Sequence, residues 1–171
     1  MLTKGAKRMK RFIIPLTIIL LVVVLFSINY KKKGTFEELV LNEYLETSKA
    51  KDFDQIVFWA DDFHKTENDA DKIDEILNKF NSLQGTEYKD GPNAWFLYTI
   101  FLKNSTTGES LAVSVMEDNW LWIHENVLSI TENKKDNITE MKYVRTEKYF
   151  KVTDGNIDYD YFATLMNSIE E

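Results

Sequence analysis

The sequence predicts an α+β fold, in which an N-terminal transmembrane helix precedes one domain with an antiparallel meander sheet packed by amphipathic helices. Three patterns predict it. An unbroken apolar run extends from Phe12 to Ile28, several runs after Ala94 alternate with a period of two, and two segments carry helical apolar stripes. A sheet that is buried on one face needs helices to cover that face, so the patterns belong together.

The apolar run predicts an uncleaved signal anchor over residues 12–30. At about 1.5 Å per residue these residues form a helix roughly 28 Å long, close to the roughly 30 Å hydrocarbon core of a bilayer. A cleaved secretory signal is the alternative, but no small-residue cleavage site follows the run. The chain has no cysteine, which excludes a lipobox. The residues expected to flank the membrane are Lys10, Arg11, Lys31, Lys32 and Lys33.

Basic residues around the span predict its orientation. Five Lys and Arg residues precede it and three follow it. Because the side with more Lys and Arg tends to stay in the cytoplasm, the tail 1–11 is expected inside and the C-terminal domain outside the cell membrane. The reversed topology, with a cytoplasmic membrane-tethered domain, stays open as an alternative.

Acidic and basic residues are unevenly distributed along the chain. The segment after Lys33 holds 13 of the 21 Lys and Arg residues and all 28 Asp and Glu residues, so residues 34–171 carry a formal charge of −15. Nucleic acid is therefore not an expected ligand, because binding it requires clustered basic residues. The expected partners are the lipid bilayer, through residues 12–30, and an envelope protein or peptide.

The segment 31–50 is predicted to be a basic joint that leads into a helix. Thr35 and Glu38 have the spacing of a capping box, and a helix is expected from Thr35 to about Ser48. Residues 51–171 then form the acidic domain. Its first element is a predicted strand from Phe53 to Ala60, rich in β-formers and ended by the polar residues that follow.

A second helix is predicted from about Asp69, with Gly85 as its stop. Its apolar stripe is Ile73, Ile76, Leu77 and Phe80. A final helix is expected from about Asp158, with an apolar stripe that begins at Phe162.

Between these helices the pattern predicts a meander of strands. The strands are 94–103, 110–116, 120–125, 141–146 and 149–153, and residues 127–130 are a further candidate. The turns at 104–108 and 117–119 are short enough for hairpins. In the third strand, Leu121 and Ile123 are expected on one face. Trp120, Trp122 and His124 are expected on the other.

Metal and catalytic patterns are weak. Asp61, Asp62 and His64 are candidate ligands for a divalent cation, but their spacing matches no known metal-site pattern. The run that starts at Asp154 resembles half of a calcium loop and lacks the glycine and glutamate of the other half. Neither histidine has a nucleophile motif beside it. We therefore expect no cofactor and no enzyme activity, and a metal-dependent envelope hydrolase is the alternative.

Aromatic residues are the better functional indication. Both faces of the strand Ala94–Leu102 are apolar, although a two-layer domain normally exposes one sheet face to water. Either a helix or loop covers the second face, or an exposed aromatic patch binds a protein, glycan or peptide. The candidate binding residues are Trp95, Tyr98, Trp120 and Trp122.

In overall plan, the Lys-flanked span and the order of strand, helix, hairpin strands and final helix resemble small single-span proteins that low-GC Gram-positive bacteria place outside the membrane. The resemblance implies location and fold type, and carries over no site residues. The expected function is binding by the domain outside the membrane, as an envelope-assembly subunit, a sensor or an immunity-type protein.

Overall fold

A computed structural model describes residues 31–60, 63–133 and 138–168. The chain divides into two compact units, residues 1–31 and residues 32–171. The second unit is one α+β domain, as predicted. The expected transmembrane helix, with Lys10 and Arg11, lies outside the described residues. Within the described ranges, no helix combines the length and the apolar character that a membrane span requires.

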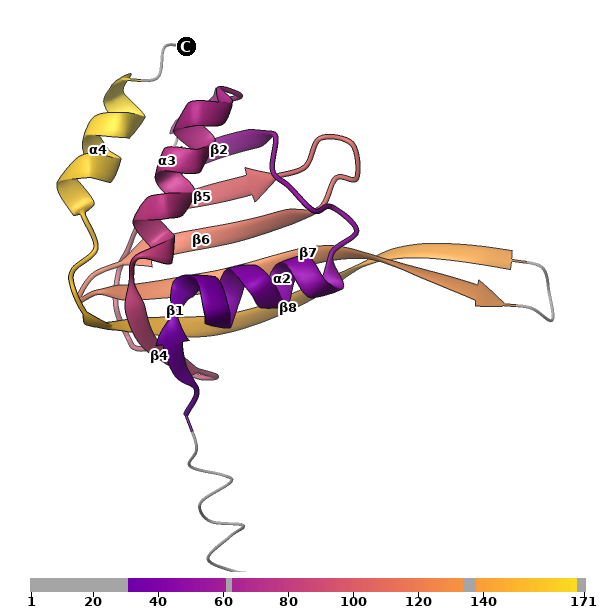
Figure 1. Ribbon diagram of the computed structural model, residues 1–171, viewed down its shortest axis with the longest axis horizontal. Helices are drawn as coiled ribbons and strands as arrows, with labels where there is room; N and C mark the ends of the chain where they lie inside the picture. The colour runs from indigo at the N-terminus through magenta and orange to yellow at the C-terminus, as the bar shows by residue number, and fades with distance from the viewer. Residues whose placement is uncertain (1–30, 61–62, 134–137, 169–171) are drawn as a thin grey trace, which may run out of the picture. The chain divides into compact units, whose positions relative to one another are not determined.

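The domain is built on an eight-stranded sheet whose neighbouring strands are all antiparallel, in the order β1-β4-β8-β7-β6-β5-β2-β3 (Figure 1). The strands are β1 Lys33–Thr35, β2 Gln55–Ala60, β3 Phe63–Glu67, β4 Gln84–Tyr88, β5 Phe96–Lys103, β6 Ser110–Met116, β7 Trp120–Asn133 and β8 Ile138–Asp154. The strands β5 to β8 follow one another across the sheet, which confirms the predicted meander.

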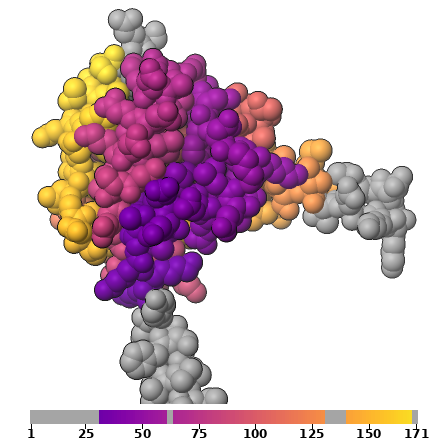
Figure 2. Space-filling view, viewed as in Figure 1, coloured from indigo at the N-terminus to yellow at the C-terminus, as the bar shows by residue number. Residues whose placement is uncertain are grey.

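The helices cover one face of this sheet (Figure 1). They are the π-helical turn η1 Glu37–Leu41, which runs directly into α2 Asn42–Thr47, then α3 Ala70–Asn81 and α4 Tyr159–Ser168. In the space-filling view, α3 lies between the N-terminal helix and α4, and together they form a continuous layer (Figure 2). Helices from three parts of the sequence thus share one face.

The first helix begins as its sequence predicts. The Thr35 amide donates to the Glu38 carboxylate at 3.0 Å, and the Glu38 amide donates to the Thr35 hydroxyl at 3.1 Å. This reciprocal pair is the predicted capping box, and it satisfies two backbone donors at the helix start. The helix begins at once after β1, so the sheet edge fixes the direction in which it leaves.

The second predicted helix is confirmed as α3, but its predicted stop is wrong. The Asp69 carboxylate caps the helix by accepting from the Asp71 and Lys72 amides at 2.9 and 3.4 Å. The helix ends at Asn81, and Gly85 lies in β4. A Cβ at Gly85 would stand 2.4 Å from the carbonyl oxygen of Lys151 on β8. Close strand approach, and not helix termination, is what requires glycine there.

Several strands differ from prediction. Residues 33–35 and 84–88 form β1 and β4, which the sequence pattern did not predict. Residues 63–67 form β3, where a polar break was expected, because they pair with β2 at the sheet edge. The strand β7 continues to Asn133, and β8 is one strand where two were expected. Their ladder runs unbroken from Trp120 opposite Lys151 to Asn133 opposite Ile138. The candidate strand 127–130 is thus part of β7, and the two strands project beyond the sheet as a long hairpin (Figure 1).

Aromatic rings join the helices to each other and to the sheet. The ring of Phe36 stacks on Phe80 at 5.2 Å, and Phe80 stacks on Phe162 at 5.0 Å, so the N-terminal helix start, α3 and α4 meet. Leu121 and Ile123 are fully buried beneath them, which confirms that they share one face of the strand. Rings of this size bury a large apolar area each, and they account for much of the core.

A lysine with three nearby carboxylates lies beneath the N-terminal helix. The Lys148 ammonium donates to the Leu39 carbonyl and to Glu43, both at 2.7 Å, and lies 3.4 Å from Glu125 and 3.9 Å from Glu87. The hydrogen bond from Lys148 lowers the pKa of Glu43. Breaking a buried ion pair leaves an uncompensated charge, so the cluster holds the helix in place on the sheet.

Lys32 has a role in the domain that the sequence did not indicate. It is expected to flank the membrane, and in the domain its ammonium lies 3.8 Å from Glu43 and 3.9 Å from Glu87. Its carbonyl also accepts from the Glu87 amide at 2.9 Å. The domain therefore begins at Lys32, two residues after the end of the predicted span.

Candidate functional site

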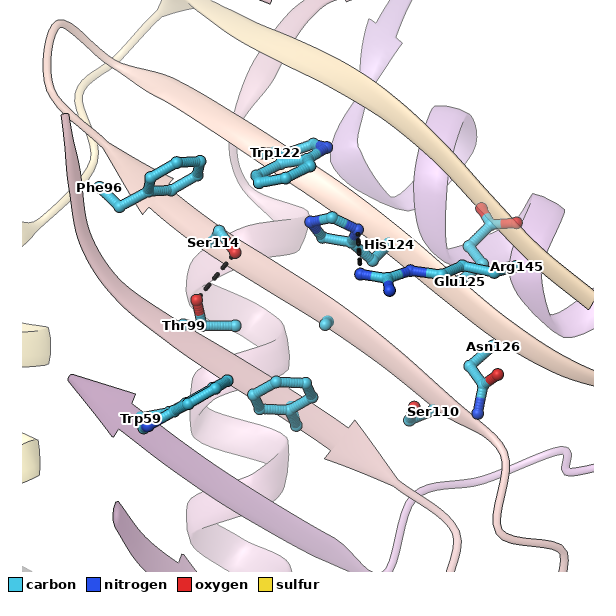
Figure 3. Close-up of a pocket in the computed structure, with 12 residues that line it drawn as sticks. Trp59, Phe96, Thr99, Ser110, Ser114, Trp122, His124, Glu125, Asn126 and Arg145 are labelled. Carbon is cyan, nitrogen blue, oxygen red and sulfur yellow. Dashed lines mark hydrogen bonds between the residues drawn. The ribbon is translucent and has the colours of Figure 1, made fainter. Parts of the chain in front are cut away.

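The sheet face without helices carries a groove of about 530 Å³. Figure 3 shows its side chains in front of the strands, with a helix behind them. It lies across β2, β5, β6, β7 and β8. Alternation puts every second side chain of these strands on this face, while the residues between them enter the helix-side core. The exception is the bulge between Phe96 and Tyr98 on β5, which brings Phe96 to the groove face together with Thr99. The groove is thus opposite the main core and separate from it.

Small side chains form the floor of the groove. Thr99 on β5 stands directly opposite Ser114 on β6, and their hydroxyls are 2.8 Å apart. Ala112 is opposite Phe101 in the same ladder. Ser114 and Ala112 are both buried. Residues this small leave a hollow between taller neighbours, which is why the face is grooved and not flat.

Aromatic rings form the two walls. Trp59 and Phe96 lie on opposite sides of the Thr99–Ser114 pair (Figure 3). The Trp59 ring is 6.0 Å from Phe101, and the Phe96 ring is 5.0 Å from Trp122. Trp59 is 55% exposed and Phe96 is 50% exposed. The walls therefore present ring surface to the groove that no described side chain fully covers.

A hydrogen-bonded pair of basic side chains forms the polar end. Nη2 of Arg145 lies 3.1 Å from Nδ1 of His124, which is 8% exposed (Figure 3). Since a guanidinium cannot accept a hydrogen bond, the histidine Nδ1 must accept this one. Burial lowers the pKa of His124, the positive charge of Arg145 lowers it further, and Glu147 opposes both. His124 is consequently neutral at pH 7, with its proton on Nε2.

Most of the hydrogen-bond donors of Arg145 remain available in the described part of the chain. Its side chain is exposed, and one hydrogen bond to His124 uses one of five N–H groups. Among the described residues, no carboxylate oxygen lies within 4.0 Å of its guanidinium. The groove thus ends at a positioned cation without an ion-pair partner in the described part of the chain.

The structure does not bring the four predicted binding residues together. Trp122 lines the groove, and Trp120 lies on the same face beside Tyr88, with ring centres 5.0 Å apart. Tyr98 was a wrong choice for a contact surface: it is 6% exposed, faces the helices and contacts the ring of Phe162. Trp95 is 78% exposed but lies before β5 and does not line the groove.

Most of the residues that line the groove were not selected from the sequence. They include Trp59, Phe96, Phe101 and Arg145. A signal existed for Trp59, because Ile56 and Phe58 alternate with it and the buried pair implies that Trp59 faces away. Arg145 had no such signal, since its position opposite Asn126 depends on the β7–β8 register.

Of the three candidate metal ligands, only His64 lies within the described residues. His64 lies on β3 and is exposed, opposite Trp59 in the ladder, while Asp61 and Asp62 lie outside the described residues. In the described part of the chain, no three His, Asp or Glu side chains are grouped so that they could hold a metal ion.

Fold and site together define an α+β domain with helices on one sheet face and an aromatic groove with a cationic end on the other. Comparisons of the chain with known protein families, with curated proteins and with solved structures find no match.

Proposed function

We propose that this protein is a single-pass membrane protein whose domain acts outside the cell membrane by binding a ligand in the groove. Residues 12–30 are its anchor, and the tail 1–11 is cytoplasmic. The apolar run and its basic flanks support the anchor. An envelope-assembly subunit, a sensor and an immunity-type protein are the roles that fit such a domain, as does the resemblance to membrane-anchored proteins of Gram-positive bacteria.

One observation carries the proposal of binding. All described helices cover one sheet face, and the other face presents half-exposed rings around a hollow of about 530 Å³. Hollows of roughly 300–1,000 Å³, lined by apolar residues with a few polar groups, are typical of ligand sites. Exposed aromatic clusters contribute little to the stability of a domain and much to recognition, so their position favours binding.

The groove chemistry supports binding over nucleophilic catalysis. A serine nucleophile needs a base within hydrogen-bond reach. The hydroxyl of Ser114 bonds with Thr99, and Nδ1 of His124 is occupied by Arg145. Ser114 and His124 are therefore bonded to other residues and do not form a nucleophile–base pair with each other.

Cysteine labelling in living cells tests location and occupancy together. The chain has no cysteine, so each introduced thiol is unique. We would compare Ser110→Cys, in the groove, with Asp160→Cys, an exposed position on α4. A membrane-impermeant maleimide is applied to intact cells and, separately, to the purified full-length chain. We expect Asp160→Cys to react equally in both, and Ser110→Cys to react several-fold more slowly in cells, because a bound ligand covers it.

The two parts of the proposal fail separately. If Asp160→Cys reacts only after lysis, the domain lies inside and the topology is wrong. If both cysteines react in cells at the rates of the purified chain, the groove is unoccupied and the proposal of binding is rejected.

A further inference from the structure

Arg145 differs from several lysines of the domain in having no carboxylate within 4.0 Å among the described residues. Residues 34–171 carry a formal charge of −15, and the lysines that lie within 4.0 Å of a carboxylate include Lys32, Lys72, Lys79 and Lys148. Lys148, on the same strand, lies within 4 Å of three carboxylates. Arg145 instead bonds to a neutral histidine at the end of an aromatic groove. Without a carboxylate within 4.0 Å in the described part of the chain, the guanidinium is available to an anion from outside.

We infer that the groove binds a small organic acid with a flat apolar body, whose carboxylate pairs with Arg145 while the body lies between Trp59 and Trp122. This inference rests on the proposed binding function of the groove and names the class of ligand.

The carboxylate is assigned from the geometry of the cationic end. A guanidinium pairs with a carboxylate through two parallel N–H bonds, and such pairs are stronger and more directional than those of an ammonium. The bond to Nδ1 of His124 holds one side of the guanidinium at 3.1 Å and leaves its other N–H groups free for a ligand. His124 itself is 8% exposed and cannot turn easily, so it acts as a positioning residue.

The flat apolar body is assigned from the walls and the floor. The rings of Trp59 and Phe101 flank one side, and those of Phe96 and Trp122 flank the other. The floor rises no higher than a threonine side chain. A planar body can lie on this floor and offer its edges and faces to the rings, which is the geometry that aromatic contacts prefer. The volume of about 530 Å³ fits a small molecule and not a folded partner.

A single acid group is favoured over two. The Glu147 carboxylate lies 3.9 Å from Nδ1 of His124 and is largely exposed. It repels any anion in the groove, because like charges at short range are unfavourable. Arg145 offsets this repulsion for one acid group, and in the described part of the chain no second Lys or Arg lines the groove to offset it for another. The groove therefore discriminates for charge number as well as for shape.

Matched probes and matched variants test the inference. The full-length chain in phosphatidylcholine nanodiscs is titrated calorimetrically with naphthoate, with its uncharged amide naphthamide, and with acetate, which lacks the apolar body. Arg145→Gln removes the proposed contact. Lys142→Gln is the control, since it removes one exposed positive charge from the same strand at a position of opposite alternation. Unchanged thermal midpoints show that both variants fold.

We expect naphthoate to bind the native chain and Lys142→Gln at least about tenfold more tightly than naphthamide or acetate, because a charged hydrogen-bonded pair distinguishes acid from amide. Arg145→Gln should abolish that preference. If naphthoate and naphthamide bind alike, if neither binds, or if Arg145→Gln keeps the preference, the assignment of an acid is overturned. Protection of Ser110→Cys in cells would then still support binding of another ligand, whereas its absence would reject the groove function itself.

Discussion

The carboxylate of Glu109 accepts a hydrogen bond from the backbone amide of Ala50 at 2.7 Å, although 59 residues separate the two in sequence. The same carboxylate accepts from the Leu128 amide at 2.8 Å, from the Ser48 hydroxyl at 2.9 Å and from the Lys49 amide at 3.2 Å. Glu109 is fully buried. One carboxylate thus joins the loop after α2 to β7, the strand that carries His124.

Glu109 should dominate the acid sensitivity of the domain. Burial raises the pKa of Glu109, but the hydrogen bonds outweigh burial and hold the pKa at about 2, below the ordinary 4.5. Because the folded pKa is depressed, the stabilisation is complete above pH 4.5 and is lost as pH falls toward 2. Glu109→Gln should lower the free energy of unfolding by roughly 3 kcal/mol at neutral pH and flatten this acid limb. Urea unfolding across this pH range measures both effects.

The control for that experiment is Glu46→Gln, an exposed carboxylate on α2. It should leave stability nearly unchanged, since surface substitutions rarely matter. Equal losses in the two variants would show that Glu109 contributes no more than a surface charge.

His124 should give a second, milder pH dependence. Its pKa is lowered by burial and by Arg145, with Glu147 opposing, so the unfolded chain takes up a proton more readily than the folded one. Stability is therefore full above pH 6.5 and falls as pH drops below it. His124→Gln should remove this loss, and His64→Gln, at the exposed histidine, should not. Thermal midpoints measured on both sides of pH 6.5 test the sign, and a steeper loss in His124→Gln would contradict it.

Gly85 should tolerate no side chain. A Cβ there would stand 2.4 Å from the Lys151 carbonyl and 2.5 Å from the Phe150 ring, and backbone cannot yield as a flexible side chain does. We expect Gly85→Ala to cost roughly 2–3 kcal/mol by overpacking. Gly155→Ala is the comparison, since Gly155 has φ +80 but nothing within 4 Å, so about 1 kcal/mol of backbone strain is expected. Thermal unfolding ranks the two variants, and the reverse order would reject the close strand approach.

Two neighbouring residues in the turn between β6 and β7 should respond in opposite ways to substitution by glycine. Asp118 and Asn119 both have φ 57, a conformation that glycine adopts without strain. Asp118→Gly should therefore stabilise the domain by about 0.5 kcal/mol. Asn119→Gly should destabilise it by about 1 kcal/mol, because its side chain accepts from the Ile157 amide at 3.2 Å and donates to Asn156 at 3.0 Å. Opposite shifts in thermal midpoint are the expected result. Equal shifts would show that these bonds contribute little.

Much of the fold could be predicted because its signals are local. The capping box at Thr35, the Asp69 helix and the period-two strand 110–116 each require only a few neighbouring residues. The strand β3 could not be predicted in this way. It contains little apolar sequence, and it forms because β2 offers an unpaired edge. Tertiary pairing outweighs local propensity at such positions.

The candidate site was less predictable because it depends on facing and register. Alternation shows that Tyr98 and Thr99 point to opposite faces, but it does not say which face the helices cover. Because the helices cover the face that holds Tyr98, the groove contains Thr99 and not Tyr98. The bond between His124 and Arg145 joins residues 21 positions apart and follows from the β7–β8 ladder, which no local pattern encodes.

The order of the sheet has a consequence for how copies of this chain behave at high concentration. Its two outermost strands are β1, with three residues, and β3, whose residues 64–67 are His, Lys, Thr and Glu. The long apolar strands β5 and β6 lie inside, with both backbone edges already paired. Exposed edges recruit other strands when they are long, flat and apolar. A very short strand and a polar one at the two ends of the strand order therefore offer the strands of other copies little to pair with.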